Sequence, residues 1–477
     1  MDLTVFNTPS KKKQPFIPLK GTDVGMYVCG VTVYDMCHIG HARSLIVFDI
    51  ISRFLKKMGY RLTYVRNFTD VDDKIIDRAN ALGRPYNEIA GQYIDEFYTD
   101  MDILKIKKAD IEPKATDHIA EIIEMVRILQ DKGLAYEASD GSVYFSVSRF
   151  KGYGKLSGRR PEDMIAGARV DIQGSKNDPL DFALWKKSKD GEPWWESPWS
   201  KGRPGWHIEC SAMSTHFLGP TLDIHGGGMD LIFPHHENET AQSEGAYGQE
   251  FVRYWVHNGF VTIEGEKMSK SLGNFMTIRE LSRDVHPEII RLLLLSRHYR
   301  SPIDFSKDAL NSSQSSLVRF YEMLDRTEQT PSKDCPQRLH DQIDTLKTNF
   351  DSAMRDDFNT AKAVAHIHDF TTGINRALDM DPVISDKDKS GIKSAVKDVS
   401  EILGILEDDP RVFLDAIKRS GIGEIGITSD EIERLIRKRN TARKDRDFKM
   451  ADEIRDMLKA KGIQLKDGPE GTVWERV

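Results

Sequence analysis

Hydrophobic positions near the start of the chain follow two alternating patterns. A short apolar run over 25–29 precedes apolar residues at helical spacing from about Ala42 to Met58, and a second run follows over 62–66. Continuous apolar runs are typical of strands buried on both faces, whereas the i, i+3, i+4 pattern is typical of an amphipathic helix. The order predicts a β–α–β unit with a parallel sheet. In open α/β sheets ligands bind at the carboxyl ends of the strands, so polar residues there are functional candidates.

The remaining chain divides into regions of different pattern. Residues from about 115 to 200 look inserted, because a helix and a short strand are followed by loops rich in Gly, Lys and Arg. Helical patterns then recur until a glycine-spaced linker, which precedes a helical hairpin and a final Gly-Pro turn. The predicted segments are the helix 119–132, the strand 142–147, the helical region 287–406, the linker 421–426, the hairpin 429–461 and a strand pair within 463–477.

Two residue clusters leave a structural and a functional interpretation open. Five of the seven tryptophans lie between Trp185 and Trp206, where packing is favoured over recognition. The hairpin carries seven basic residues between Arg437 and Lys449. For this run alone a solvated helix face is favoured over a contact with RNA.

Composition narrows the class of protein. A chain of 477 residues is expected to form roughly two to four domains. It is 39% hydrophobic and 30% charged, and no apolar stretch is long enough to cross a bilayer. Four cysteines in so long a chain do not make a disulfide framework, so we expect a reducing, cytoplasmic location and no membrane partner. The net charge of -7 means that RNA would have to bind a local basic surface.

Two groups of nitrogen donors stand far apart in the chain. His38 and His41 lie at the predicted strand-to-helix junction, where backbone N–H groups and the helix dipole favour anions. The segment Lys267–Ser271 lies in a predicted loop between Gly265 and Gly273. Neither group contains a nucleophile of the triad type. Both suit phosphate handling, which requires positioning and neutralisation of developing charge.

A third group combines thiols, imidazoles and carboxylates. Pro234 predicts a helix start, which would place His235 and Glu239 on one face. With Cys29 and Cys210 they make a set that could hold zinc tetrahedrally. The spacing is not that of a zinc finger, so buried thiols remain the alternative. Periodicity does not choose between His235 and its neighbour 236, which also lies one turn from Glu239.

The motifs together resemble the cysteinyl-tRNA synthetase family of class I aminoacyl-tRNA synthetases along nearly the whole chain. The matching segments are Tyr27–Asp35, His38–His41, Tyr64–Lys74, Gly205–Met213, Asp223–Glu239 and Lys267–Asn274. The resemblance implies activation of L-cysteine by ATP, supplied with Mg²⁺, and transfer to the terminal adenosine of tRNA(Cys). Because the substrate carboxylate is the nucleophile, the protein has to supply orientation and charge stabilisation.

Residue roles follow from the same resemblance. Catalytic, ATP-binding roles fall on His38, His41, Lys267 and Lys270, and further ATP contacts fall on Gly227 and Gly228. The substrate pocket would include Thr69, Trp206 and Asp230. The zinc ligands of the family match Cys29, Cys210, His235 and Glu239, which implies one Zn²⁺ per chain and a thiolate-selective site. Cys37 is then expected to be packed near the helix start, and Cys335 has no assigned role.

The implied fold class is α/β, with a Rossmann-type parallel-sheet catalytic domain carrying an inserted connective domain. An all-helical anticodon-binding bundle and a small C-terminal α/β module would follow. The expected limits are 1–115 with 191–265 (catalytic), 116–190 (inserted), 266–310 (Lys267–Ser271 loop and stem contact), 311–420 (helical) and 427–477 (C-terminal). The family also implies a monomer.

Two other functions share these motifs. One is a ligase that transfers activated cysteine to a small amine or sugar acceptor, as in the mycothiol pathway. That enzyme lacks the full anticodon-reading tail, whereas this chain continues from Asn311 to Val477. The other is a non-catalytic RNA-binding paralogue, which the intact His38, His41, Lys267 and Lys270 disfavour.

Overall fold

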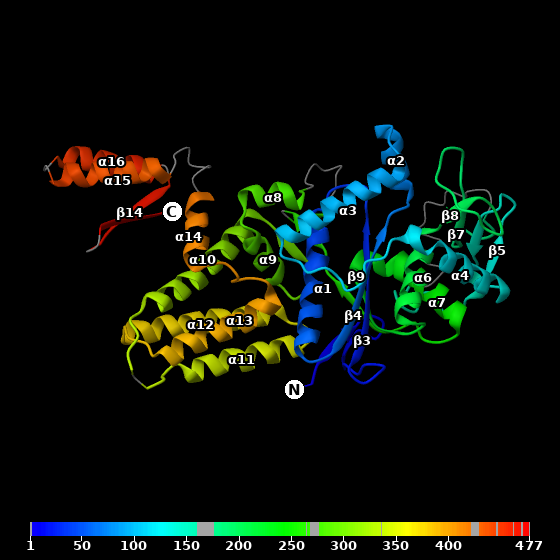
Figure 1. The fold of residues 1–477 in the computed structure, drawn as a ribbon, viewed down its shortest axis with the longest axis horizontal. Helices are drawn as coiled ribbons and strands as arrows, with labels where there is room; N and C mark the ends of the chain where they lie inside the picture. The colour runs from blue at the N-terminus through cyan, green and yellow to red at the C-terminus, as the bar shows by residue number, and fades with distance from the viewer. Residues whose placement is uncertain are drawn as a thin grey trace.

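A four-stranded parallel sheet forms the centre of the molecule (Figure 1). The computed structural model describes residues 2–159, 176–263, 265–267, 276–334, 336–420, 429–444, 447–460, 462–468 and 471–476. The strand order is β10-β9-β3-β4, and all three neighbouring pairs are parallel. The strands are β3 (Asp23–Thr32), β4 (Arg61–Thr69), β9 (Leu222–Gly228) and β10 (Val252–Asn258).

The predicted β–α–β unit is confirmed, with different limits. Helix α1 (Ile39–Lys57) connects β3 to β4 and begins before the predicted start at Ala42. The early start arises because His38 caps the helix with its side chain, a role that hydrophobic spacing does not register. Both strands are also longer than their apolar runs, since β4 continues through polar residues to Thr69.

The segment between β4 and β9 contains helices and a second sheet. After α2 (Asp73–Leu82) and α3 (Tyr86–Ile103), the short helix η1 (Ala115–His118) leads into α4 (Ile119–Asp131). An antiparallel sheet follows in the order β5-β6-β7-β8. Its strands are β5 (Ala135–Glu137), β6 (Val143–Phe145), β7 (Phe182–Lys187) and β8 (Gly202–Pro204).

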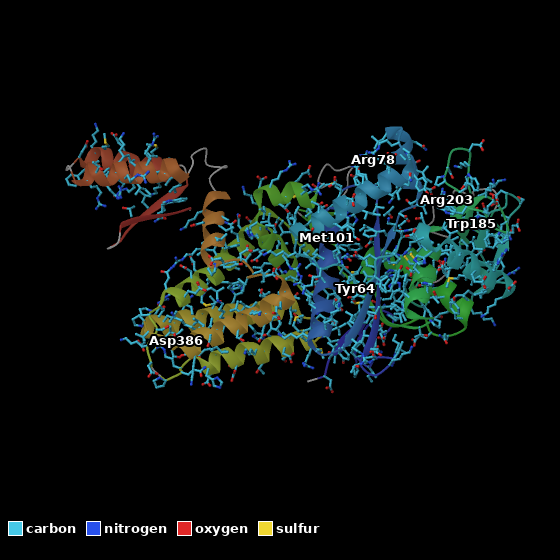
Figure 2. All side chains as sticks on the ribbon, viewed as in Figure 1. Tyr64, Arg78, Met101, Trp185, Arg203 and Asp386 are labelled. Atoms are coloured by element: carbon cyan, nitrogen blue, oxygen red, sulfur yellow. The ribbon has the colours of Figure 1, made fainter. Side chains whose placement is uncertain are left out.

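This second sheet has its own core, in which Trp185 is fully buried. Figure 2 labels Trp185 and Arg203 in this module, which lies to one side of the parallel sheet. The sheet runs to Pro204, past the expected limit of 190, and β6 is shorter than the predicted strand 142–147. Packing explains Trp185, but Trp194 and Trp206 are 49% and 39% exposed.

Helix α6 (Trp206–Leu218) returns the chain to β9, and α7 (Glu237–Tyr247) connects β9 to β10. The expected helix start at Pro234 is wrong. A π-helical turn (Ile232–His236) precedes α7, and Phe233 inside it has an extended backbone (φ -140°, ψ 130°). The regular helix therefore begins at Glu237.

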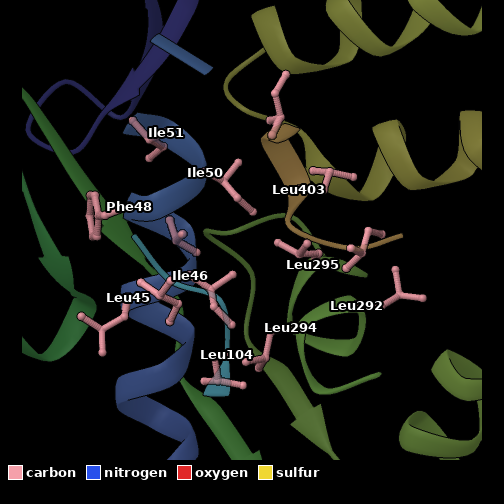
Figure 3. Close-up of a cluster of buried hydrophobic side chains, with 14 of the residues drawn as sticks. Leu45, Ile46, Phe48, Ile50, Ile51, Leu104, Leu292, Leu294, Leu295 and Leu403 are labelled. Carbon is pink, nitrogen blue, oxygen red and sulfur yellow. The ribbon is translucent and has the colours of Figure 1, made fainter. Parts of the chain in front are cut away.

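Helices dominate the chain beyond β10. The helices are α8 (Ile278–Asp284), α9 (Pro287–Leu295), α10 (Lys307–Gln329), α11 (His340–Arg355), α12 (Thr360–Met380), α13 (Asp386–Leu403) and α14 (Pro410–Ser420). A small sheet stands among them, in which β11 (Val261–Ile263) and β12 (Glu266–Lys267) precede α8, and β13 (Ile303–Phe305) lies between α9 and α10. One apolar core is continuous from α1 to α9 and the end of α13 (Figure 3).

The C-terminal residues form the expected helical hairpin and strand pair. Helices α15 (Ser429–Lys444) and α16 (Phe448–Ala460) precede the antiparallel β14 (Ile463–Gly468) and β15 (Gly471–Arg476). Ile432, Ile454 and Ile463 belong to a core within this module. At the N-terminus, β1 (Thr4–Asn7) pairs with β2 (Lys12–Pro15). No helix among the described residues is long and apolar enough to span a membrane.

Candidate active site

Four side chains from different elements converge at the carboxyl edge of the parallel sheet. They are Cys29 on β3, Cys210 on α6, His235 on the π-helical turn and Glu239 on α7. One ligand atom of each lies within 4.8 Å of the others. The Cys29 and Cys210 sulfurs are 3.6 Å apart, and Glu239 Oε1 lies 3.2 Å from Cys29 Sγ. The structure thus brings together all four predicted metal ligands.

The cluster has the chemistry and dimensions of a zinc site. Zinc with Zn–S bonds of about 2.3 Å places two sulfurs of a tetrahedron about 3.8 Å apart, close to the observed 3.6 Å. The set of two thiols, one imidazole and one carboxylate also suits a borderline-soft metal. Cys210, His235 and Glu239 are buried and Cys29 is half-buried, so Cys29 faces the more accessible side.

The structure distinguishes His235 from His236, which periodicity does not. His235 Nε2 lies 3.0 Å from Glu239 Oε1, whereas the corresponding distance for His236 is 3.9 Å. His236 Nδ1 instead lies 2.8 Å from Nε2 of His257. His236 and His225 also form an alternative set with Cys29 and Glu239. That set has one thiol only, so it is the less thiophilic of the two.

Two further histidines, the half-buried His207 and the buried His225, contact the ligands and orient them. His207 Nδ1 lies 2.8 Å from His235 Nδ1, which leaves His235 Nε2 directed at the cluster. His225 Nε2 lies 2.8 Å from Glu239 Oε2. Such partners set the tautomer and basicity of metal ligands. His207 and His225 have no role among the residues predicted from the sequence. The histidine that directly precedes three glycines in β9 is the signal for His225.

Two members of the cluster are held in charged forms that bind metals, whereas the other two are held protonated. The hydrogen bond from Cys29 is the foremost cause that lowers the pKa of Cys210 to about 6. Burial raises the pKa of Cys29 well above its usual range. Burial also acts to raise the pKa of Glu239, but His225 and His235 hold it well below its usual range. Burial acts to lower the pKa of His235, but Glu239 and Cys210 raise it to about 10. A metal that binds here would therefore displace the protons of His235 and Cys29.

The His38–His41 segment forms the start of α1. His38 is the N-cap, and its Nδ1 accepts hydrogen bonds from the backbone N–H groups of Gly40 (3.0 Å) and His41 (3.4 Å). His41 Nδ1 accepts from the backbone N–H of His38 at 3.4 Å, and the two rings are stacked 3.7 Å apart. A neutral ring whose Nδ1 accepts carries its proton on Nε2. Both imidazoles can therefore donate from Nε2 beside a helix N-terminus, where anions bind well.

Only part of the second basic segment can be placed. Lys267 lies in β12, with its backbone opposite Thr262 of β11. Lys270 and the neighbouring residues 268–275 lie outside the described residues, as does Cys335. Cys37 is 4% exposed, which confirms that it is packed near the start of α1.

The other predicted contacts lie at the ends of strands. Gly227 and Gly228 end β9, opposite His257 and Asn258 of β10. A Cβ on Gly227 would lie 2.9 Å from Leu231 and 3.0 Å from His236. Close packing under the site is thus one reason for glycine here. Asp230 is exposed in the short turn that follows.

Thr69 contacts the residue next to Cys210, and Trp206 contacts His235, so both lie close to the candidate metal cluster. The Thr69 hydroxyl donates to Glu209 Oε2 at 2.9 Å. Burial raises the pKa of Glu209 well above its usual range. Glu209 is not among the site residues predicted from the sequence, although its position next to Cys210 indicates that it lies near the site. The ring of Trp206 lies 4.4 Å from that of His235. Trp206 also lines a cavity of about 1070 Å³ between α2 and the second sheet, with residues that include Asp73, Lys186, Arg203 and His207.

The fold resembles that of solved aminoacyl-tRNA synthetases. Mycobacterium tuberculosis methionyl-tRNA synthetase in complex with methionyl-adenylate aligns with a TM-score of 0.59 at 17% identity, over 80% of this chain and 89% of that chain. A putative arginyl-tRNA synthetase from Campylobacter jejuni gives 0.58 at 13% identity, over 81% and 94%. A family model described as the class I (C) tRNA synthetase catalytic domain matches residues 15–315. The protein is therefore of the class I aminoacyl-tRNA synthetase type.

Full-length relatives identify the family within this class. The chain is 52% identical to cysteine–tRNA ligase of Trichlorobacter lovleyi and 51% identical to that of Geobacter metallireducens, in each case over 100% of both chains. Residues 349–407 match a DALR domain, and residues 428–474 match a cysteinyl-tRNA ligase anticodon binding domain. The chain belongs to the cysteine–tRNA ligase family, which confirms the predicted family and fold class.

Proposed function

We propose that this protein is an enzyme that ligates L-cysteine to tRNA(Cys) at the expense of ATP, through a cysteinyl-adenylate. The observation that carries the proposal is the cluster of Cys29, Cys210, His235 and Glu239 at the sheet edge. One member of this cluster, Cys29, lies on β3, and β3 leads into the helix that His38 caps. Full-length relatives named cysteine–tRNA ligase support both the reaction and the tRNA partner.

The nucleotide would bind at the start of α1. The Nε2–H groups of His38 and His41 would donate to phosphate oxygens, and the helix N-terminus would favour the charge that develops there. Lys267 and Lys270 would neutralise the departing pyrophosphate, with Mg²⁺ bound to ATP. Gly227 and Gly228 would border the nucleotide. These residues orient the α-phosphate for attack by the cysteine carboxylate, so no protein nucleophile is required.

The amino acid would bind between the cluster and Thr69. A zinc ion held by Cys29, Cys210, His235 and Glu239 would provide a soft Lewis acid that selects a thiol over a hydroxyl. Thr69 and Trp206 would form the walls of this pocket, and Asp230 would face the ammonium or adenosine. His207 and His225 would hold the ligands in register. A pocket without a metal would discriminate poorly between serine and cysteine, which differ by a single atom.

The remaining assignments extend the same proposal. The catalytic domain would comprise 1–115 and 191–265, with the inserted domain 116–190 at the acceptor end of the tRNA. Residues 266–310 would contact the stem, and 311–420 with 427–477 would reach the anticodon. The matched DALR and anticodon binding domains support the last assignment. The proposed setting is a monomer in the cytoplasm, in keeping with four cysteines in 477 residues.

One set of assays tests the proposal. Purified protein should contain about one zinc per chain, charge a tRNA(Cys) transcript with cysteine, and leave serine and amino-sugar acceptors unused. Cys210→Ser should lose the zinc and slow cysteine-dependent pyrophosphate exchange by about 10²-fold or more. Cys335→Ser, which changes a thiol with no assigned role, is the matched control. Cysteine-dependent exchange that survives complete zinc removal would contradict the metal assignment, and transfer to an amino sugar instead of tRNA would contradict the substrate.

A further inference from the structure

A second group of potential ligands lies away from the active site, where α4 begins and α6 ends. It consists of His118 at the end of η1, Glu121 in the first turn of α4 and His216 in the last turn of α6. Their ligand atoms all lie within 4.8 Å of one another. Glu121 Oε1 is 3.4 Å from His118 Nδ1 and 3.5 Å from His216 Nδ1. One carboxylate oxygen thus stands between two imidazole nitrogens.

These distances lie at the outer limit of hydrogen bonding and also match those expected around a shared cation. N–H···O bonds are typically about 2.9 Å long, well short of the observed 3.4 and 3.5 Å. A tetrahedral zinc with bonds of about 2.05 Å to nitrogen and oxygen places its ligands about 3.3 Å apart. The observed separations therefore match two edges of such a tetrahedron.

The two imidazoles are held in place by a common neighbour. The ring of Phe217 lies 5.2 Å from that of His118 and 4.8 Å from that of His216, edge-on to both. Helix α4 packs against α6, so the backbones that carry the three residues are fixed relative to each other. A site whose side chains are ordered before binding loses less entropy when it takes up an ion.

The cluster is also accessible from solvent. The exposed fractions of the side chains are 13% for His118, 33% for Glu121 and 44% for His216. An ion can therefore enter, and its remaining coordination position can be filled by water. Two imidazoles with one carboxylate are typical ligands for Zn²⁺ and for other late first-row divalent ions.

We infer that His118, Glu121 and His216 form a second divalent metal site, selective for borderline transition metals and separate from the Cys29 cluster. The metal joins the first turn of α4 to the last turn of α6. Cys210 lies nearer the start of the same helix α6. A metal at the second site would therefore stabilise the helix that carries one of the proposed zinc ligands. This inference does not depend on the proposed function.

Cobalt binding tests the site, because the two clusters have different spectra. Cobalt bound by thiolates absorbs through sulfur-to-metal charge transfer, whereas cobalt bound only by nitrogen and oxygen does not. Tag-free protein that retains its resident zinc is titrated with Co²⁺ and followed by calorimetry and absorption. The expected result is one further equivalent bound without a charge-transfer band. His216→Ala and His118→Ala should each weaken this binding at least about tenfold.

Glu124→Gln provides the matched control, because Glu124 is a 64% exposed carboxylate on the same helix. It should bind the second equivalent with unchanged affinity. The inference is overturned if the zinc-loaded protein takes up no second equivalent, or if His216→Ala binds as tightly as the unmodified protein. Uptake that shows thiolate charge transfer would also overturn it, since the ion would then be exchanging into the Cys29 cluster. None of these results depends on whether the protein charges tRNA.

Discussion

Arg291 on α9 joins the parallel-sheet domain to the helical region, and its replacement by methionine should loosen that junction. The guanidinium is 1% exposed and lies 2.5 Å from Asp49 on α1, which is equally buried. It also donates to the carbonyl oxygens of Leu403 at 2.6 Å and Leu104 at 3.0 Å. The surrounding apolar core, which includes Leu104, Leu294 and Leu403, shields these contacts from solvent (Figure 3).

The loss of stability in Arg291→Met depends on the hydrogen bonds that Asp49 keeps. Removing one partner of a buried ion pair costs about 3–5 kcal/mol, since the other charge stays buried. Asp49 still accepts from Arg53 Nε at 2.9 Å and from the backbone N–H of Lys107 at 3.2 Å. We therefore expect the lower end of the range, about 3 kcal/mol. That free energy corresponds to about 150-fold faster opening of the local structure.

Hydrogen exchange followed by mass spectrometry measures this opening directly. In Arg291→Met, peptides that cover 104–107 and 403–406 should exchange about 10²-fold faster than in the unmodified protein. Arg326→Met is the control, because its pair with Asp379 is 39% and 67% exposed and should be worth less than about 1 kcal/mol. The reasoning is refuted if exchange at the junction is unchanged, or if the two variants behave alike.

Four further substitutions test packing and charge at different places in the fold. Gly30→Ala would place Cβ 1.6 Å from a backbone oxygen of β4, so the zinc content and the melting temperature of the protein should both fall. Gly91→Ala, whose Cβ would have no atom within 4 Å, should instead stabilise helix α3 by about 0.5–1 kcal/mol. Equal melting temperatures for the two variants would contradict this reasoning. The hydrogen bond with His286 lowers the pKa of Asp408 to about 2, so this carboxylate stabilises the fold above its unfolded pKa of about 3.9 and the effect is lost as pH falls toward 2. In Asp408→Asn, the free energy of unfolding measured by urea titration should fall less steeply as the pH is lowered toward 2. An unchanged pH dependence would contradict the role of Asp408. Glu237→Gln removes the negative charge that accepts hydrogen bonds from backbone N–H groups of the inserted module at 2.8 and 2.9 Å. The free energy of unfolding of this region should fall by about 2 kcal/mol, and hydrogen exchange over 153–158 should become faster. Unchanged hydrogen exchange there would contradict the prediction.

Local pattern was sufficient for the first β–α–β unit and for the C-terminal hairpin, because both are built from neighbours in sequence. It was insufficient for β9, whose residues Leu-Asp-Ile-His-Gly-Gly-Gly have little intrinsic preference for a strand. That strand forms because it is paired with both β3 and β10 in the buried middle of the sheet. Helix starts were misplaced for a similar reason. The cap made by His38 and the extended Phe233 are features of individual side chains and dihedral angles, which spacing does not encode.

The candidate metal cluster could be named from the motifs but not from the spacing alone. Cys29 and Cys210 are separated by 181 positions, and only the tertiary fold brings them together. Between His235 and His236 the choice depends on the irregular turn, which breaks the regular helical spacing that made the two equivalent. His207 and His225, which contact the ligands, could not be given this role from spacing alone, because only the tertiary fold brings them next to His235 and Glu239.

Parallel topology explains why the proposed nucleotide residues and the proposed metal residues alternate along the chain. Strand β3 carries Cys29 and leads to His38, while the adjacent β9 carries His225 and leads to His235. Because both strands end at the same edge, two segments that are distant in sequence must face each other there. A residue that lies between these two segments, such as Gly30, should therefore affect both the nucleotide-binding and the metal-binding residues. If the backbone of β3 and β4 must approach closely to align thiol and phosphate, Gly30→Ala should impair zinc retention and ATP binding together, whereas Cys210→Ser should leave ATP binding intact.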